Sequence, residues 1–203
     1  MAMEASSETQ KKSNTIWLEI WDFVKTIIIF AIIYVVIRTY VAQPFLVRGR
    51  SMEQTFSDGD YLVVDELSYR FREPKRFEVI VFKTDFIAEN APQEYYIKRI
   101  IGLPGDRIVI KDGKVLVYEN NSIIPTELSE AYISDGIQTL APELVDITLG
   151  ENKYFVLGDN RGNSSDSRYW GELDKSYIVG KPMVRLLPLN NLTFFSQEEF
   201  EGN

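Results

Sequence analysis

The sequence contains no histidine and no cysteine among its 203 residues. These two absences exclude a Ser-His-Asp triad, a thiolate nucleophile, a histidine-ligated zinc site and disulfide bonds. A hydrolase built from this chain must therefore activate a hydroxyl group with a lysine or a carboxylate, and a Ser–Lys pair is an established variant of the triad. The lack of cysteine does not indicate a compartment, because many exported bacterial domains also have none.

Positive charge is also scarce, since the net charge is −8 at pH 7. This balance argues against a nucleic-acid partner, which requires clustered lysine and arginine. The exception is local: Arg38, Arg48 and Arg50 lie close together at the end of an apolar segment. The length suits one buried domain plus an appendage, and the 45% hydrophobic content indicates a globular chain rather than a disordered one.

Long apolar runs are missing except near the N-terminus. Residues 1–14 are polar without a hydrophobic pattern, so we expect a disordered tail. Residues 26–37 are uncharged and apolar but too short to cross a bilayer, for which about 20 residues are needed. Extending the segment to residues 20–41 gives that length if Lys25 and Arg38 reach toward the two interfaces. We therefore predict a single transmembrane anchor over residues 15–42.

Two other interpretations of this segment are a cleaved signal peptide and a buried element of a soluble core. The segment runs into Gln43-Pro44-Phe45 without a small-x-small cleavage pattern, which disfavours the first. The length and the flanking residues favour the anchor over both. Charge does not fix its orientation, because lysines precede the segment and arginines follow it.

The remainder, residues 43–203, is expected to be mostly β, with antiparallel strands forming a catalytic domain after the N-terminal transmembrane helix. Asp112-Gly113 between two apolar runs predicts a hairpin. Residues 119–151 are acidic and interrupted by prolines, which indicates a variable insertion or small subdomain. The expected strands cover residues 77–82, 94–101, 107–110, 114–118, 145–149, 154–157 and 178–187.

Ser51 and Lys98 are the candidate reactive pair. Ser51 follows Gly49, which permits a tight backbone approach, and Lys98 lies in a strand pattern flanked by apolar residues. On a buried face, desolvation would depress the pKa of a lysine toward the value that a general base needs. Taken singly, each has an ordinary alternative: a loop serine, and a solvent-facing lysine beside Arg99.

A polar run from Gly158 to Arg168 is harder to explain as an ordinary surface loop. It begins with a turn signal after an expected strand, and Asp166 and Arg168 are spaced to form an ion pair. Its amides and hydroxyls are suited to orienting a lysine side chain. A polar loop with a chance ion pair remains the alternative for this run alone.

Together these segments resemble the sequence blocks of bacterial type I signal peptidases, the Ser/Lys leader peptidases of family S26. The most specific matches are residues 95–106, YYIKRIIGLPGD, and residues 158–171, GDNRGNSSDSRYWG. The resemblance implies a membrane-anchored serine endopeptidase that removes N-terminal signal peptides from exported preproteins after a small-x-small motif. It implies that Ser51 is the nucleophile and Lys98 the general base.

The resemblance also implies supporting roles. Ser164 would hydrogen-bond the lysine amine, Asp166 with Arg168 would brace the loop, and Gly158 would let the backbone pass close to the site. The Ser51 N–H would hold the oxyanion, while Gly49 replaces a serine that is a second donor in some members. The residues expected to line shallow pockets for small substrate side chains are Phe45, Val47, Met52, Phe56, Leu62, Tyr96 and Ile97.

The implied partners are exported preproteins and the bilayer, near the secretion translocon, with no nucleic acid, no metal and no cofactor. The catalytic domain would lie on the extracytoplasmic side of the cytoplasmic membrane. Because the base is a lysine, the activity should be highest on the alkaline side of neutral.

The usual SMxPTL pattern reads SMEQTF here, which changes local shape but removes no catalytic group. Two rivals are a LexA-like self-cleaving repressor, which lacks the late block, and an inactive tethered binding module, which would have lost Ser51 or Lys98.

Overall fold

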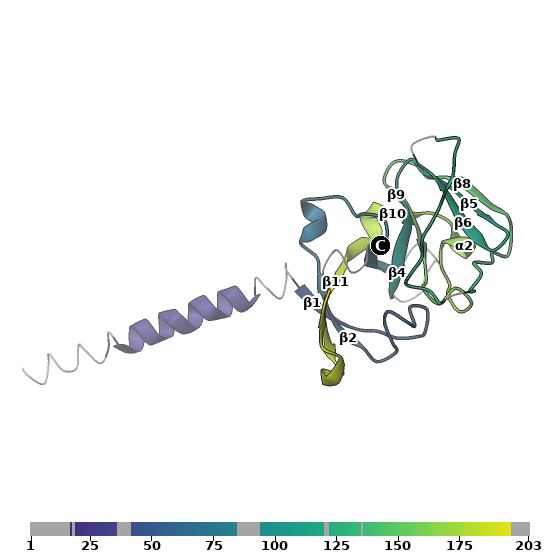
Figure 1. Cartoon of the computed structure of the whole chain (residues 1–203). Coiled ribbons are helices and arrows are strands. Elements are labelled where there is room, and N and C mark those ends of the chain that lie inside the picture. Colours follow the sequence, from purple (N-terminus) through teal and green to yellow (C-terminus); the bar gives the residue numbers. More distant parts are fainter. Residues whose placement is uncertain are drawn as a thin grey trace, which may run out of the picture. The chain divides into compact units, whose positions relative to one another are not determined.

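The computed structural model describes residues 17, 19–35, 42–84, 94–119, 122–134 and 136–195. The chain divides into two compact units, residues 1–41 and 42–203. In the first unit residues 19–35 are helical, and their side chains are exposed (Figure 1). Within the described residues, no helix combines the length and apolar character required to cross a membrane. The predicted tail and residues 15, 16, 18 and 36–41 of the predicted anchor lie outside the described residues.

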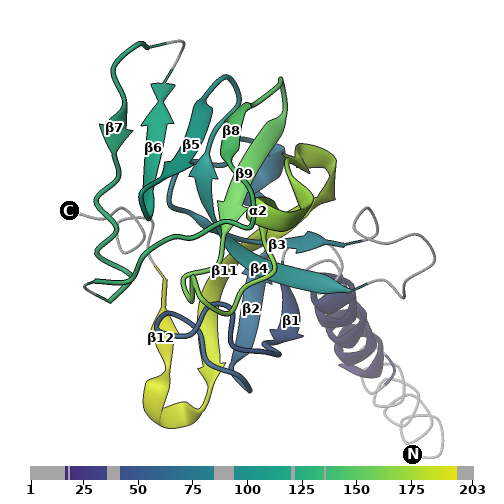
Figure 2. The same cartoon turned by 90° about the vertical axis from the view of Figure 1, so that its right-hand side faces the viewer.

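The second unit is built from two antiparallel sheets, which confirms the predicted mostly β architecture (Figure 2). The larger sheet has the order β1 (Ala42–Leu46), β2 (Tyr61–Asp65), β11 (Ile178–Leu187), β3 (Val79–Lys83), β4 (Tyr95–Gly102), β9 (Lys153–Leu157) and β10 (Leu173–Asp174), with β12 (Thr193–Phe194) paired to β11. The smaller sheet has the order β7 (Thr126–Glu127), β6 (Lys114–Tyr118), β5 (Arg107–Lys111) and β8 (Val145–Thr148). Short helical turns are η1 (Ser68–Arg70), α2 (Ser167–Trp170), η3 (Lys175–Tyr177) and η4 (Leu189–Asn191).

The β5–β6 hairpin follows directly from its turn residues. Asp112 and Gly113 have φ angles of 52° and 77°, and Lys111 pairs with Lys114 across the turn. Two consecutive left-handed residues match the twist of the flanking strands, which is why Asp-Gly is favoured there. The predicted hairpin is therefore confirmed.

Strand β4 lies in the middle of the larger sheet, between β3 and β9. Its residues 98–102 are all buried, so this part of the strand is covered on both faces. Successive side chains of a strand point to opposite faces. Lys98 and Arg99 are therefore both withdrawn from water, but on opposite sides of the same sheet.

The predicted insertion, residues 119–151, supplies β7 and β8 to the smaller sheet. Between these two strands the described residues form turns and irregular backbone. Thr139 is tied to the hairpin, because its N–H donates to the carbonyl of Gly113. Polar side chains of this irregular stretch also contact the loop that follows β9.

Candidate active site

Ser51 lies in a tight turn after β1. The carbonyl of Val47 accepts a hydrogen bond from the N–H of Gly59, and the N–H of Gly49 donates to the Asp58 carboxylate at 2.8 Å. Gly49 has φ of +87°, a conformation that disfavours any residue with a Cβ. The turn thus holds the half-buried Ser51 side chain at the edge of a cleft.

The side chain of Lys98, which lies on β4, extends to the Ser51 hydroxyl. Its side-chain nitrogen lies 2.7 Å from Ser51 Oγ and 2.9 Å from the carbonyl oxygen of Ile97. The aromatic ring of Tyr96 lies 5.1 Å from the nitrogen. Lys98 is only 3% exposed, so its amine is enclosed by protein while still touching the hydroxyl.

The pKa of Lys98 is lowered from 10.5 to about 8. Burial is the main cause, because removal from water disfavours the charged ammonium. The negative charges of Asp166 and Asp159 act in the opposite direction and limit the decrease. A substantial fraction of neutral amine therefore exists close to physiological pH, which is the form that accepts a proton.

The loop after β9 contacts the turn that carries Ser51. The N–H of Asn160 donates to the carbonyl of Ser51 at 3.0 Å, and its side-chain amide donates to the carbonyl of Arg50 at 3.0 Å. A Cβ on Gly158 would lie 2.5 Å from the Ser51 carbonyl oxygen and closer still to the Ser164 hydroxyl. Only glycine fits at this position without displacing the backbone that carries Ser51.

Asp166 and Arg168 form the ion pair that their spacing predicted. The Asp166 carboxylate accepts hydrogen bonds from Nε and Nη2 of Arg168, both at 2.8 Å, and from the N–H of Gly158 at 3.0 Å. Both side chains are almost fully buried. The pair therefore ties the start of α2 to the first residue of the loop.

Ser164 does not make the expected hydrogen bond to the lysine amine. Its hydroxyl is buried and has no hydrogen-bond partner among the described residues. It instead packs against Gly158. The N–H of Ser51 likewise makes no hydrogen bond within the described part of the chain, which leaves a donor beside the Ser51 hydroxyl.

The cleft beside the pair has a volume of about 550 Å³. Five of the seven expected pocket residues line it: Phe45, Val47, Leu62, Tyr96 and Ile97. Met52 and Phe56 do not line it but are 1% exposed in an apolar cluster with Val47 and Leu62. They fill the space behind the cleft wall rather than face the cleft.

Comparison with known proteins places the chain in a family. The family model described as "Signal peptidase, peptidase S26" matches residues 20–187. The chain belongs to the signal peptidase family. A probable signal peptidase I-2 of Synechocystis is 36% identical over 187 residues, covering 92% of this chain and 80% of the relative. A signal peptidase I of Bacillus licheniformis is 33% identical over 193 residues, covering 91% and 97%.

A crystal structure of a signal peptidase I from Enterococcus faecalis matches with 28% sequence identity and a TM-score of 0.42, covering 54% of this chain and 97% of that one. Membership of the family makes the protein a serine endopeptidase that removes signal peptides. Among the described residues of this signal peptidase, no cluster of carboxylates is arranged to hold a metal ion.

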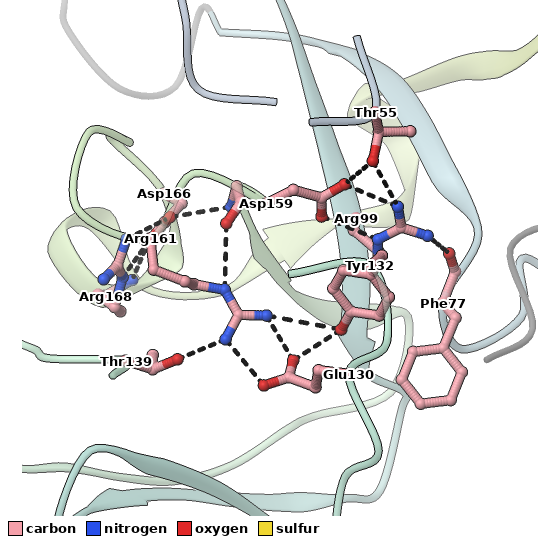
Figure 3. A network of polar contacts seen from close by, with 11 residues as sticks. Thr55, Phe77, Arg99, Glu130, Tyr132, Thr139, Asp159, Arg161, Asp166 and Arg168 are labelled. Atoms are coloured by element: carbon pink, nitrogen blue, oxygen red, sulfur yellow. Dashed lines mark hydrogen bonds and ion pairs between the residues drawn. The ribbon is translucent and has the colours of Figure 1, made fainter. Parts of the chain in front are cut away.

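Sequence reasoning missed a second buried ion pair of this signal peptidase. Arg99 donates from Nε and Nη2 to the two carboxylate oxygens of Asp159, at 2.8 and 2.7 Å (Figure 3). Thr55, four residues after Ser51, donates a hydrogen bond from its hydroxyl to Asp159 at 2.5 Å. The available signal was the position of Arg99 in a strand of otherwise apolar pattern, where a second cation needs a buried partner.

Proposed function

We propose that Ser51 and Lys98 form the catalytic dyad of a membrane-anchored signal peptidase that cleaves exported preproteins after a small-x-small motif. The 2.7 Å contact between Lys98 Nζ and Ser51 Oγ is the observation that carries this proposal. It is supported by the burial of the lysine, which gives it a pKa suited to general-base catalysis near neutral pH.

In the proposed mechanism, neutral Lys98 takes the proton of the Ser51 hydroxyl as Oγ attacks the carbonyl carbon before the scissile bond. The resulting ammonium then gives its proton to the leaving amine, which yields the acyl-enzyme. Lys98, neutral again, takes a proton from water as the water oxygen attacks the ester carbonyl. The ammonium returns this proton to Ser51 Oγ as the ester C–O bond breaks, which releases the signal peptide and regenerates Ser51. Each step transfers one proton through the same amine.

The oxyanion of the tetrahedral intermediate would be held by the Ser51 N–H. Donors that are already oriented toward the developing charge stabilise it without further reorganisation. Gly158, Asp166 and Arg168 would maintain the geometry through the backbone contact between the loop and Ser51. Ser164 would assist Lys98 once substrate binding brings its hydroxyl within reach.

Selection for small residues would follow from the cleft's apolar wall. Phe45, Val47, Leu62, Tyr96 and Ile97 present side chains that complement a small aliphatic group. Met52 and Phe56 would limit the depth of the pocket from behind, because they fill the adjacent core. A bulky substrate side chain would then have to displace packed side chains at a cost of about 1–3 kcal/mol.

The location of the enzyme would be the cytoplasmic membrane, with the catalytic unit on its extracytoplasmic side near the secretion translocon. The helical residues 19–35, with their exposed apolar side chains, support an anchor over residues 15–42. Tethering would raise the effective concentration of the site where signal peptides emerge from the bilayer.

The function is tested with the detergent-solubilised full chain and a preprotein that carries an Ala-x-Ala cleavage site. We expect one cut after the second alanine, read from the product N-terminus by mass spectrometry. A matched preprotein with leucine in place of the last alanine should be cleaved at least tenfold more slowly. Equal cleavage of both substrates, or cuts elsewhere, would contradict the proposed specificity.

The rate should depend on pH because the reaction needs neutral Lys98. The neutral fraction rises as pH increases through the lysine pKa of about 8, so kcat/KM should increase about tenfold per unit below that value and level off above it. The measurement is a pH–rate profile from pH 6 to 10, with enzyme stability checked at each pH. A profile that is flat over this range would show that Lys98 is not the base.

A further inference from the structure

Side chains of the irregular stretch between β7 and β8 bind a buried arginine in the loop that follows β9. Glu130 binds Arg161 through both carboxylate oxygens: Nη1 lies 2.9 Å from Oε2, and Nη2 contacts Oε1 (Figure 3). The Arg161 side chain is completely buried, and that of Glu130 is 12% exposed. Thr139, from the same stretch, accepts a further hydrogen bond from Arg161.

Tyr132 links this pair to the second buried arginine. Its hydroxyl donates to Glu130 Oε1 at 2.6 Å, while its ring lies 3.9 Å from the guanidinium of Arg99. Arg99 in turn holds Asp159, the residue after Gly158. Side chains of the stretch therefore contact both Arg161 and Arg99, and Figure 3 shows both arginines beside Asp159.

Arg161 also contacts the backbone of Gly158. Its Nε donates to the Gly158 carbonyl at 3.1 Å, and the Gly158 N–H is held by Asp166 at 3.0 Å. Both polar groups of Gly158 are thus fixed by buried charged side chains. A Cβ on Gly158 would lie 2.5 Å from the Ser51 carbonyl oxygen, so no side chain fits there.

Glu130 is the only carboxylate with a hydrogen bond to Arg161 among the described residues. Burial lowers the pKa of Arg161, but the hydrogen bond and charge of Glu130, with further contributions from Tyr132 and Asp159, leave the pKa raised. Without that carboxylate the guanidinium is a buried charge lacking its main counterion, a state that proteins avoid by moving the group toward water. Such a movement would withdraw the donor from Gly158.

We propose that Glu130 is a positioning residue for the nucleophile: through Arg161 it fixes Gly158, and through Gly158 it fixes the turn that carries Ser51. This inference rests on the proposed dyad for its kinetic consequence. The stretch between β7 and β8 is then part of the catalytic apparatus, although none of its residues lines the cleft. We expect it to contribute little to substrate binding, because the cleft walls come from other elements.

The kinetic test compares Glu130→Gln with Glu127→Gln in the full-length enzyme. Glu127 lies three residues earlier and pairs with Lys114 at an exposed site, so its change should leave the rate within twofold of the parent. We expect Glu130→Gln to lower kcat about tenfold with KM within twofold of the parent, at a temperature where both variants are folded. A fall in melting temperature with unchanged kcat would show a purely structural role and overturn the proposal.

The path through Arg161 is tested with a double-mutant cycle. If Glu130 acts through Arg161, adding Glu130→Gln to Arg161→Gln should lower kcat no further than Arg161→Gln alone, and removal of both buried charges can restore part of the activity. If the two losses multiply instead, Glu130 acts by another route and the proposed path is wrong.

Hydrogen exchange tests the same inference without relying on activity. Peptides covering residues 50–56 and 158–165 should exchange faster in Glu130→Gln than in the parent, because the Asn160 N–H bonds to Ser51. Glu127→Gln should match the parent in both peptides. Unchanged exchange in Glu130→Gln would refute the positioning role of Glu130 even if no substrate were cleaved. Failure of the parent to cleave the Ala-x-Ala preprotein, with the exchange difference present, would instead refute only the proposed function.

Discussion

Replacing Ser51 with alanine is expected to lower kcat for signal-peptide cleavage by about 10⁴-fold or more, the loss typical of removing a nucleophile from a hydrolase. The Oγ atom is the hydroxyl that Lys98 contacts, and no second hydroxyl is hydrogen-bonded to the lysine among the described residues. The side chain is half-buried and alanine is slightly smaller, so the fold should persist.

The measurement is single-turnover cleavage of the Ala-x-Ala preprotein by parent and variant at pH 9. Ser165 is a matched control, because it also lines the cleft and loses only an exposed hydroxyl when changed to alanine. Ser165→Ala should retain activity within a few-fold of the parent. Comparable cleavage by Ser51→Ala and the parent would mean that another residue is the nucleophile.

Lys98→Met is expected to abolish activity and, at the same time, to raise the free energy of unfolding by about 3 kcal/mol at pH 7. The pKa of Lys98 falls from 10.5 to about 8 on folding because the amine is buried. Below pH 8 the folded protein must therefore hold a charged ammonium in an unfavourable site. Methionine has a similar length and no charge to bury, so it removes this cost.

The sign of the pH dependence follows from proton binding. Between pH 8 and 10.5 the unfolded chain binds more protons at Lys98 than the folded chain, so this residue makes stability rise with pH. The advantage of Lys98→Met should therefore be full below pH 8 and disappear as pH approaches 10.5. Urea unfolding of parent and variant at pH 7 and pH 10 measures the difference in their free energies of unfolding at each pH.

Lys111→Met is the matched control for the stability change. Lys111 ends β5, and its side chain is exposed, so replacing it should change the unfolding free energy by less than about 0.5 kcal/mol. A destabilisation by Lys98→Met at pH 7 would mean that the contacts of the amine outweigh the cost of burying its charge. That result would contradict the expected stabilisation.

The strands were predictable because each is encoded locally. The apolar runs around residues 79–83, 95–102 and 178–187 are long and bounded by turn residues, and the Asp-Gly pair specifies its own hairpin. The meeting of Ser51 and Lys98 was predictable only through the family resemblance, since 47 positions separate them in the chain. The Asp166–Arg168 pair needed no such help, because its members are two residues apart.

The partners of the other buried arginines were not predictable from the sequence. Arg99 and Asp159 are 60 positions apart, and Glu130 and Arg161 are 31 apart. An acidic residue in a weakly patterned stretch looks like an ordinary surface residue until the fold places a buried cation beside it. For the same reason the stretch was predicted only as a variable insertion. The missing Ser164 bond reflects packing against Gly158, which is likewise a long-range effect of folding.

Side chains alternate between the two faces of β4, and this alternation limits the insertions and deletions that the strand tolerates. Lys98 on one face becomes a weak base that is readily neutral, while Arg99 on the other face meets a carboxylate and keeps its charge. Inserting or deleting a single residue between Tyr95 and Lys98 would exchange the two faces and place the arginine beside Ser51. The alternation of side chains along the strand thus decides which of two neighbouring cations contacts Ser51 and which pairs with Asp159, so we expect homologous strands to vary by substitution and not by length.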